Sequence, residues 1–189
     1  MIRIALVGDI GSGKSYFAKL FGYPVFNADS VVAEIYKKNK RIFHKIKKKL
    51  PTFFSSFPLK KEELIKCILA NKTNLRKITK IIHPLVRKQM EIFIKRNKNK
   101  RLLILDIPLF LENKLNKKND LIIFIQSPSK KINKRLLKRV NYNKRLIDKF
   151  REVQWSSQKK KKKSNFVIKN YFERKKAINS VNIILKKVL

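Results

Sequence analysis

The sequence predicts an α/β fold, a three-layer α/β/α sandwich in which a parallel sheet of five strands is covered by helices on both faces. Short apolar runs typical of buried strands alternate with stretches of helical periodicity. A glycine-rich turn joins the first run to the first helix, and acidic residues follow two of the runs. Strands alternating with helices predict parallel pairing with right-handed crossovers. The predicted strands are residues 2–7, 24–27, 101–106, 121–125 and 166–168.

The glycine-rich turn is the most specific feature of the sequence. The chain has four glycines, and Gly8, Gly11 and Gly13 lie within six positions of one another. The segment from Gly8 to Ser15 reads GDIGSGKS and matches the phosphate-binding pattern G-x-x-x-x-G-K-[ST] in full. An apolar strand precedes it and a helical pattern follows it, which argues against a chance match in a helix-capping loop. The sequence therefore predicts a P-loop nucleoside-triphosphate-binding fold.

The residue types of this loop fit the chemistry of a triphosphate. Glycines allow successive backbone N–H groups to converge on phosphate oxygens, and the following helix adds its partially positive N-terminus. Lys14 is expected to reach the β- and γ-phosphates of ATP, and the Ser15 hydroxyl is placed to bind Mg²⁺.

Two acids follow predicted strands, at the edge of the sheet where α/β proteins bind ligands. Asp29 comes just after residues 24–27 and could accept a proton from an acceptor hydroxyl. The alternative is that Asp29 is the N-cap of a helix starting at Ser30. Asp106 ends the apolar run 101–106 and resembles a Walker B acid, which implies a place near the metal.

The whole chain, residues 1–189, is predicted to form one P-loop domain with two added regions. Residues 30–98 have helical periodicity, broken by Pro51, Pro58 and Pro84, and are expected to form a substrate-side subdomain. Residues 135–163 are rich in Lys and Arg and are expected to fold over the phosphates as a lid.

Charge is extreme, with 49 Lys and Arg against 12 Asp and Glu, a net charge of +37. Such a field attracts polyanions. The basic residues are spread along the chain without interleaved aromatics, so compositional drift explains them better than a dedicated nucleic-acid partner. The dense run of lysines at residues 159–163 is predicted to be a solvated loop or helix end.

The remaining composition bears on where the protein works. The apolar stretches fall short of the roughly 18 residues that a membrane span requires, and no signal peptide is expected at the N-terminus. The single cysteine, Cys67, cannot form an internal disulfide, which suits a reducing compartment. We therefore expect a cytoplasmic protein without a membrane partner, a monomer or a weak oligomer.

Five segments together resemble the dephospho-CoA kinase family. They are GDIGSGKS at residues 8–15, FNAD at 26–29, IHPLV at 82–86, LDIPLFLE at 105–112 and NFVIKN at 165–170. A phosphate loop alone occurs in many enzymes, whereas HPL followed by DIPL and Glu is close to diagnostic of this family. The resemblance implies transfer of the γ-phosphate of ATP to the ribose 3′-hydroxyl of dephospho-CoA, with Mg²⁺.

The resemblance also implies a role for individual residues. Lys14, Asp29 as general base, and Arg139 in the lid would be catalytic. ATP would contact Gly8, Gly11, Ser12, Gly13, Lys14, Ser15, Tyr16 and, near its adenine, Asn170. Dephospho-CoA would contact Asp29, His83, Pro84, Asp106 and Glu112, and the metal would contact Ser15 and Asp106.

Several of these roles have structural alternatives. His83 before a proline could cap or interrupt a helix, Glu112 could form a structural pair, and Arg139 is one of many basic residues. The sequence also departs from the family pattern: Asp9 and Asn27 stand where a glycine and an acid are common, and the glycine expected after Asn170 is missing.

Two other functions are compatible with the residues alone. One is a P-loop kinase acting on a nucleoside or nucleotide. The other is a basic nucleic-acid-binding protein that keeps a nucleotide fold for binding only.

Overall fold

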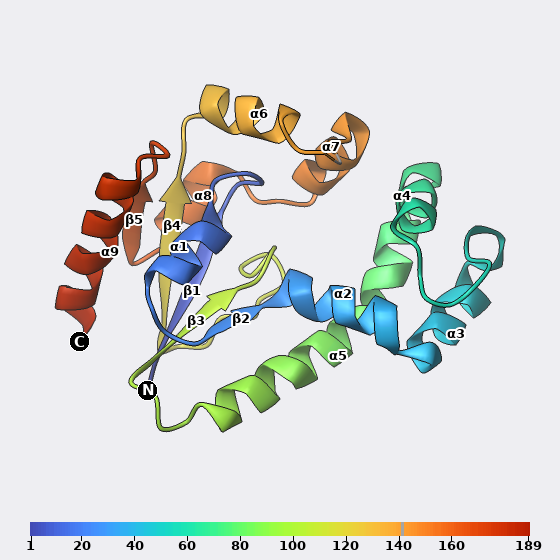
Figure 1. Ribbon diagram of the computed structural model, residues 1–189, viewed down its shortest axis with the longest axis horizontal. Helices are drawn as coiled ribbons and strands as arrows, with labels where there is room; N and C mark the ends of the chain where they lie inside the picture. The colour runs from blue at the N-terminus through green and yellow to red at the C-terminus, as the bar shows by residue number, and fades with distance from the viewer. Residues whose placement is uncertain (141) are drawn as a thin grey trace. The chain divides into compact units, whose positions relative to one another are not determined.

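The computed structural model describes residues 1–140 and 142–189, which form two compact units. The first unit consists of Met1–Asn27 and Asn97–Leu189, and the second of Ala28–Arg96. In Figure 1 the first unit contains the sheet, and the second consists of the helices α2 to α5.

The first unit is built on five parallel strands in the order β2-β3-β1-β4-β5. Parallel pairing places the carboxyl ends of all strands at one edge of the sheet, where the phosphate loop follows β1. The α/β fold class predicted from the sequence is confirmed. The strands are β1 (Ile2–Gly8), β2 (Val25–Asn27), β3 (Leu102–Asp106), β4 (Asp120–Gln126) and β5 (Phe166–Lys169).

The central strands β1, β3 and β4 are buried along most of their length, as their nearly continuous apolar sequences require. On one face, alternate residues such as Ile4 and Leu6 pack in a core with α1 (Lys14–Leu20) and α9 (Arg174–Val188). Residues of the opposite face, Ala5 and Leu103 among them, are buried as well, and α8 (Ser157–Lys162) contacts β1 and β4. This core fixes the strand ends that carry the loop.

The region predicted as a lid contains three short helical segments. They are the end of α6 (Ser129–Leu137), then α7 (Lys144–Glu152), then α8. Residue 141 lies in the predicted lid but outside the described residues. The lysine run at 159–163 belongs to α8 and its C-cap, and Lys160 is buried, so the prediction of a solvated run is wrong for this residue.

The second unit is helical. Its helices are α2 (Ala28–Lys38), α3 (Lys40–Lys49), the 3₁₀ helix η1 (Pro51–Phe53), α4 (Lys61–Ala70) and α5 (Asn74–Arg96). Pro84 was predicted to break the helix, but it lies inside α5. Helix α5 packs against α2, α3 and α4, and this packing holds the helix together across the proline.

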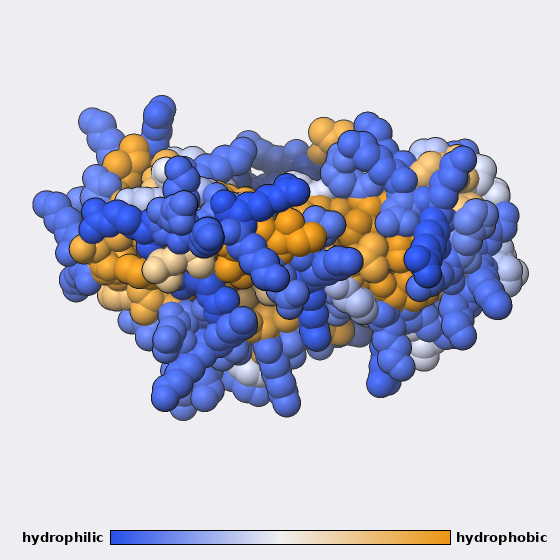
Figure 2. Space-filling view, turned by 90° about the horizontal axis from the view of Figure 1, so that it is seen from below, coloured by the Kyte–Doolittle hydropathy of each residue, from blue (hydrophilic) through white to orange (hydrophobic). Residues whose placement is uncertain are grey.

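Hydrophilic side chains cover much of the face shown in Figure 2, around smaller hydrophobic patches. This distribution agrees with the lysine-rich composition. Across residues 1–140 and 142–189, none of the helices combines the length and apolar character needed to cross a bilayer.

Candidate active site

The phosphate loop has the strand–loop–helix geometry predicted for it, between β1 and α1. Gly13 has φ 97°, a left-handed conformation that side chains with a Cβ disfavour, and a Cβ there would lie 2.8 Å from Asn170 Nδ2. A Cβ on Gly8 would lie 2.7 Å from the carbonyl oxygen of Ile125. Both positions therefore require glycine for the backbone to follow this path.

Lys14 begins α1, and its side chain lies along the loop. Its Nζ donates hydrogen bonds to the carbonyl oxygens of Gly8 (3.1 Å) and Asp9 (3.0 Å). The ammonium group therefore sits over the backbone that would surround a phosphate, as a phosphate-binding lysine requires.

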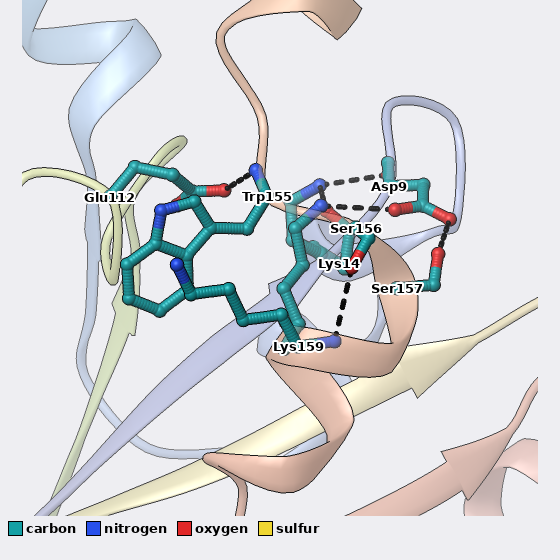
Figure 3. Close-up of polar contacts among 9 residues, drawn as sticks. Asp9, Lys14, Glu112, Trp155, Ser156, Ser157 and Lys159 are labelled. Carbon is teal, nitrogen blue, oxygen red and sulfur yellow. Dashed lines mark hydrogen bonds and ion pairs between the residues drawn. The ribbon is translucent and has the colours of Figure 1, made fainter.

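Asp9, at a position where glycine is common, is bonded to α8. Ser157 Oγ donates to its Oδ2 at 2.6 Å, and Lys160 Nζ donates to its Oδ1 at 3.0 Å. Figure 3 shows Ser157 beside Asp9 and Lys14 on the same loop. Burial alone would raise the pKa of Asp9, but the hydrogen bonds from Ser157 and Lys160 and the charges of Lys160 and Lys14 outweigh it and lower the pKa.

Glu112 contacts the segment that leads into α8. Its Oε1 accepts a hydrogen bond from the backbone N–H of Trp155 at 2.9 Å (Figure 3). Lys159 Nζ lies 3.9 Å from the centre of the Trp155 ring, a cation–π contact. The structural pairing considered for Glu112 is therefore present, and its contact with substrate stays a prediction.

A single pocket brings several of these groups together. Lys14, Glu112, Gln154 and Lys160 contribute its polar side chains. The remaining lining residues are Val7, Gly8, Ile107, Leu109 and Phe110. Two lysines and an acid thus face one space beside the phosphate loop.

Asn170 ties the end of β5 to the phosphate loop. It is 3% exposed, and its Nδ2 donates to the carbonyl oxygen of Ser12 at 2.8 Å, an oxygen that also accepts from Ser127 Oγ at 2.8 Å. Its Oδ1 accepts from the N–H of Phe172 at 2.8 Å. Phe172 has φ 64°, a left-handed backbone that residues with a Cβ rarely adopt. The predicted adenine contact of Asn170 is not tested by these bonds.

Asp106 ends β3 and is almost fully buried. Its Oδ2 accepts a hydrogen bond from Asn27 Nδ2 at 2.7 Å, and the two residues are paired in the register of β2 and β3. Asn27, which stands where the family commonly has an acid, is therefore a hydrogen-bond donor to the Asp106 carboxylate.

One arginine of the predicted lid, Arg135, lies close to the phosphate loop. The guanidinium of Arg135 lies 4.6 Å from the Phe172 ring centre, and its Nη1 is 3.8 Å from the place a Cβ on Gly13 would take. Arg139, predicted at the end of the lid helix, is exposed and comes directly after the C-cap of α6, and its contact with the transferred phosphate stays a prediction. Tyr16, another predicted ATP contact, is 41% exposed.

Three of the predicted site residues belong to the second unit. Asp29 lies in the first turn of α2, which begins at Ala28, so the alternative of an N-cap before Ser30 is wrong. His83 and Pro84 are both inside α5, so His83 neither caps nor ends a helix. Burial, aided by the charge of Arg87, lowers the pKa of His83 and keeps its imidazole neutral near pH 7.

The residues near the loop suit magnesium better than a softer metal. Mg²⁺ takes oxygen ligands, usually one or two from the protein with the rest from phosphate and water. Ser15 offers a hydroxyl at the start of α1, and Asp106 keeps one carboxylate oxygen beyond the one bonded to Asn27. Among the described residues, no three His, Cys, Asp or Glu side chains cluster as a protein-only metal site would need.

A phosphate loop on a parallel five-stranded sheet, with a lysine at the start of the following helix and a buried acid at a strand end, defines a P-loop nucleoside-triphosphate-binding protein. Solved structures agree on the fold. A Thermus thermophilus protein matches with a TM-score of 0.81 at 23% identity, covering 100% of this chain and 98% of that one. A shikimate kinase from Bacteroides thetaiotaomicron matches with a TM-score of 0.52 at 13% identity, covering 98% and 97%.

Sequence comparison then identifies the family. The sequence model of the dephospho-CoA kinase family matches residues 2–175. A dephospho-CoA kinase of Wolbachia pipientis is 36% identical over 87% of each chain, and one from the Wolbachia of Brugia malayi is 33% identical over 96% of this chain and 95% of its own. The chain belongs to the dephospho-CoA kinase family, which confirms the resemblance of the five segments.

Proposed function

We propose that the phosphate loop and the strand ends beside it transfer the γ-phosphate of ATP to the ribose 3′-hydroxyl of dephospho-CoA with the help of Mg²⁺. The reaction of the chain is the ATP-dependent phosphorylation of dephospho-CoA in coenzyme A biosynthesis. The observation that carries the assignment of residues is the loop itself, with Lys14 Nζ within 3.1 Å of the Gly8 and Asp9 carbonyls. It supports binding of ATP by the first unit.

The ATP side of the mechanism uses the loop and its neighbours. Main-chain N–H groups from Gly11 to Ser15 bind phosphate oxygens, and Lys14 turns from the loop carbonyls to the β- and γ-phosphates. Magnesium, when bound, neutralises charge on the phosphate oxygens. Ser15 and Asp106 would hold it. A lid arginine, Arg135 or Arg139, would stabilise charge on the transferred group.

The acceptor side requires a group that takes a proton from the attacking hydroxyl. We assign this role to Asp29, two residues after the end of β2, where the chain leaves the sheet beside the Asn27–Asp106 pair. The carboxylate is exposed and follows the carboxyl end of a strand, the usual place for catalytic side chains in such sheets. His83, Pro84 and Glu112 would contact dephospho-CoA, and residues 28–96 would form the acceptor subdomain.

An assay of ATP-dependent phosphorylation of dephospho-CoA tests these assignments. Lys14→Ala should abolish transfer, and Asp29→Asn should lower kcat by roughly 10²–10⁴ if the carboxylate is the base. Two matched controls should retain full activity. Lys19→Ala changes an exposed residue of α1, the helix of Lys14, and Glu34→Gln changes an exposed residue of α2, the helix of Asp29. An unchanged kcat in Asp29→Asn would remove Asp29 from the mechanism, and activity in Lys14→Ala would overturn the proposed use of the loop.

A further inference from the structure

The carboxylate of Asp9 is unusual in its position. The loop from Gly8 to Ser15 is the part of the chain that must receive a triphosphate, and Asp9 is the only acid in it. A carboxylate near bound phosphates repels them, and the repulsion strengthens in a site shielded from water. The chain therefore needs a way to compensate this charge.

Lys160 supplies the compensation from α8. Its Nζ is 3.0 Å from Asp9 Oδ1, and its side chain is 2% exposed although it stands in a run of five lysines. A buried ammonium is costly unless an anion pairs with it. Lys160 and Asp9 thus compensate each other's charge. Ser157 donates a hydrogen bond of 2.6 Å to the second carboxylate oxygen of Asp9.

The backbone of Asp9 connects this ion pair to the conformation of the phosphate loop. The Asp9 carbonyl oxygen accepts from the N–H of Ser12 at 3.1 Å and from Lys14 Nζ at 3.0 Å. The residue whose side chain is fixed to α8 is therefore the same residue whose carbonyl shapes the loop and receives the phosphate-binding lysine. Lys160 also lines the pocket that Lys14 lines.

We propose that Lys160 is a positioning residue for phosphoryl transfer, which acts through Asp9 by cancelling the charge of its carboxylate and fixing it to α8, so that the loop accepts the phosphates of ATP. The proposal rests on the function proposed for the loop. It assigns Lys160 no contact with ATP. Its effect is on ATP binding, whereas Lys14 acts on the phosphates directly.

A double-mutant cycle with Asp9→Asn and Lys160→Met tests this role. Lys160→Met leaves the carboxylate without its ammonium partner and with the Ser157 hydrogen bond alone, so the KM for ATP should rise by about 10-fold or more, the effect of removing one partner of a part-buried charge pair. Asp9→Asn removes the repulsion itself and should change the KM for ATP by less than about threefold. In the double variant the KM should return to within about threefold of the Asp9→Asn value.

The controls separate this role from others. Lys161→Met removes the same charge from an exposed neighbour in α8 and should leave the KM for ATP unchanged. Lys160→Arg keeps a cation and should preserve the KM within a few-fold. The wild type and Lys14→Ala report on the proposed function independently of these variants, so failure of one proposal can be told from failure of the other.

Three outcomes would overturn the inference. A double variant as impaired as Lys160→Met would mean that Lys160 contacts ATP itself. A lower melting temperature in Lys160→Met with an unchanged KM for ATP would make the pair only structural. Equal rises of the KM for ATP in Lys160→Met and Lys161→Met would mean that only the net charge of α8 matters and not the pair with Asp9. If Lys160→Met does not fold, the double variant is compared with Asp9→Asn, and a KM for ATP more than about threefold above that of Asp9→Asn would overturn the proposal.

Discussion

Asn170 offers a measure of how strongly the end of β5 holds the phosphate loop. The structure gives its amide two hydrogen bonds of 2.8 Å, to the Ser12 carbonyl oxygen and from the Phe172 N–H, in a site that is 3% exposed. Asn170→Ala removes both. With about 1 kcal/mol for each bond, and somewhat more because a buried partner is left unsatisfied, the free energy of unfolding should fall by about 2–3 kcal/mol.

Ser127 makes this prediction sharper, because it shares an acceptor with Asn170. In Ser127→Ala the Ser12 carbonyl keeps its bond from Asn170 Nδ2, so this variant alone should cost only about 1 kcal/mol. The double variant leaves the carbonyl without either donor. The free energy of unfolding lost in the double variant should therefore exceed the sum of the losses in the two single variants by roughly 1 kcal/mol.

Urea unfolding of the nucleotide-free enzyme, with the KM for ATP measured in parallel, gives both numbers. Asn182→Ala is the matched control, since Asn182 is exposed on α9 and its loss should stay within about 0.5 kcal/mol. Strict additivity of the two variants would refute the shared acceptor. Unchanged stability of Asn170→Ala with a raised KM for ATP would refute the structural role and favour the adenine contact predicted from the sequence.

Two further predictions concern backbone strain and pH. Phe172→Gly should be more stable than Phe172→Ala by about 1 kcal/mol in urea unfolding, because both lose the ring beside Arg135 but only alanine keeps a Cβ at φ 64°; equal stabilities would contradict the strain. The lowered pKa of His83 means that the unfolded chain binds its proton more readily, so stability present above pH 6.5 should be lost as pH falls through the folded pKa. His83→Gln should flatten this loss in unfolding measured from pH 7.5 to 5, and an unchanged slope would show that His83 is not its source.

The sequence predicted those parts of the site that depend on local backbone chemistry. The phosphate loop was predictable because glycine at positions 8 and 13 is required by close approaches that few other residues permit. Strand ends were predictable because buried parallel strands are continuous apolar runs. In both cases the residues of one short segment are enough to determine its local backbone structure.

Features that depend on tertiary contacts were not predictable in the same way. Five successive lysines contain no periodicity, so nothing in the run itself indicates that Lys160 points inward while its neighbours are exposed. The signal lay 151 positions away, in the acid at position 9, which needed a partner. Pro84 is the converse case, a strong local signal for a helix end that the packing of α5 overrides.

Asp9 and Asp106 show how a chain with 49 basic residues and 12 acids can treat its carboxylates differently. Asp9 is paired with an ammonium group, which cancels the charge where a phosphate must approach. Asp106 accepts from the amide of Asn27, and an amide stabilises a carboxylate without cancelling its charge. A carboxylate held in this way suits a magnesium ligand, whereas an ammonium group in the place of Asn27 would compete with the metal. Asn27, where the family commonly has an acid, thus leaves one charge fewer at the strand end and helps orient the Asp106 carboxylate.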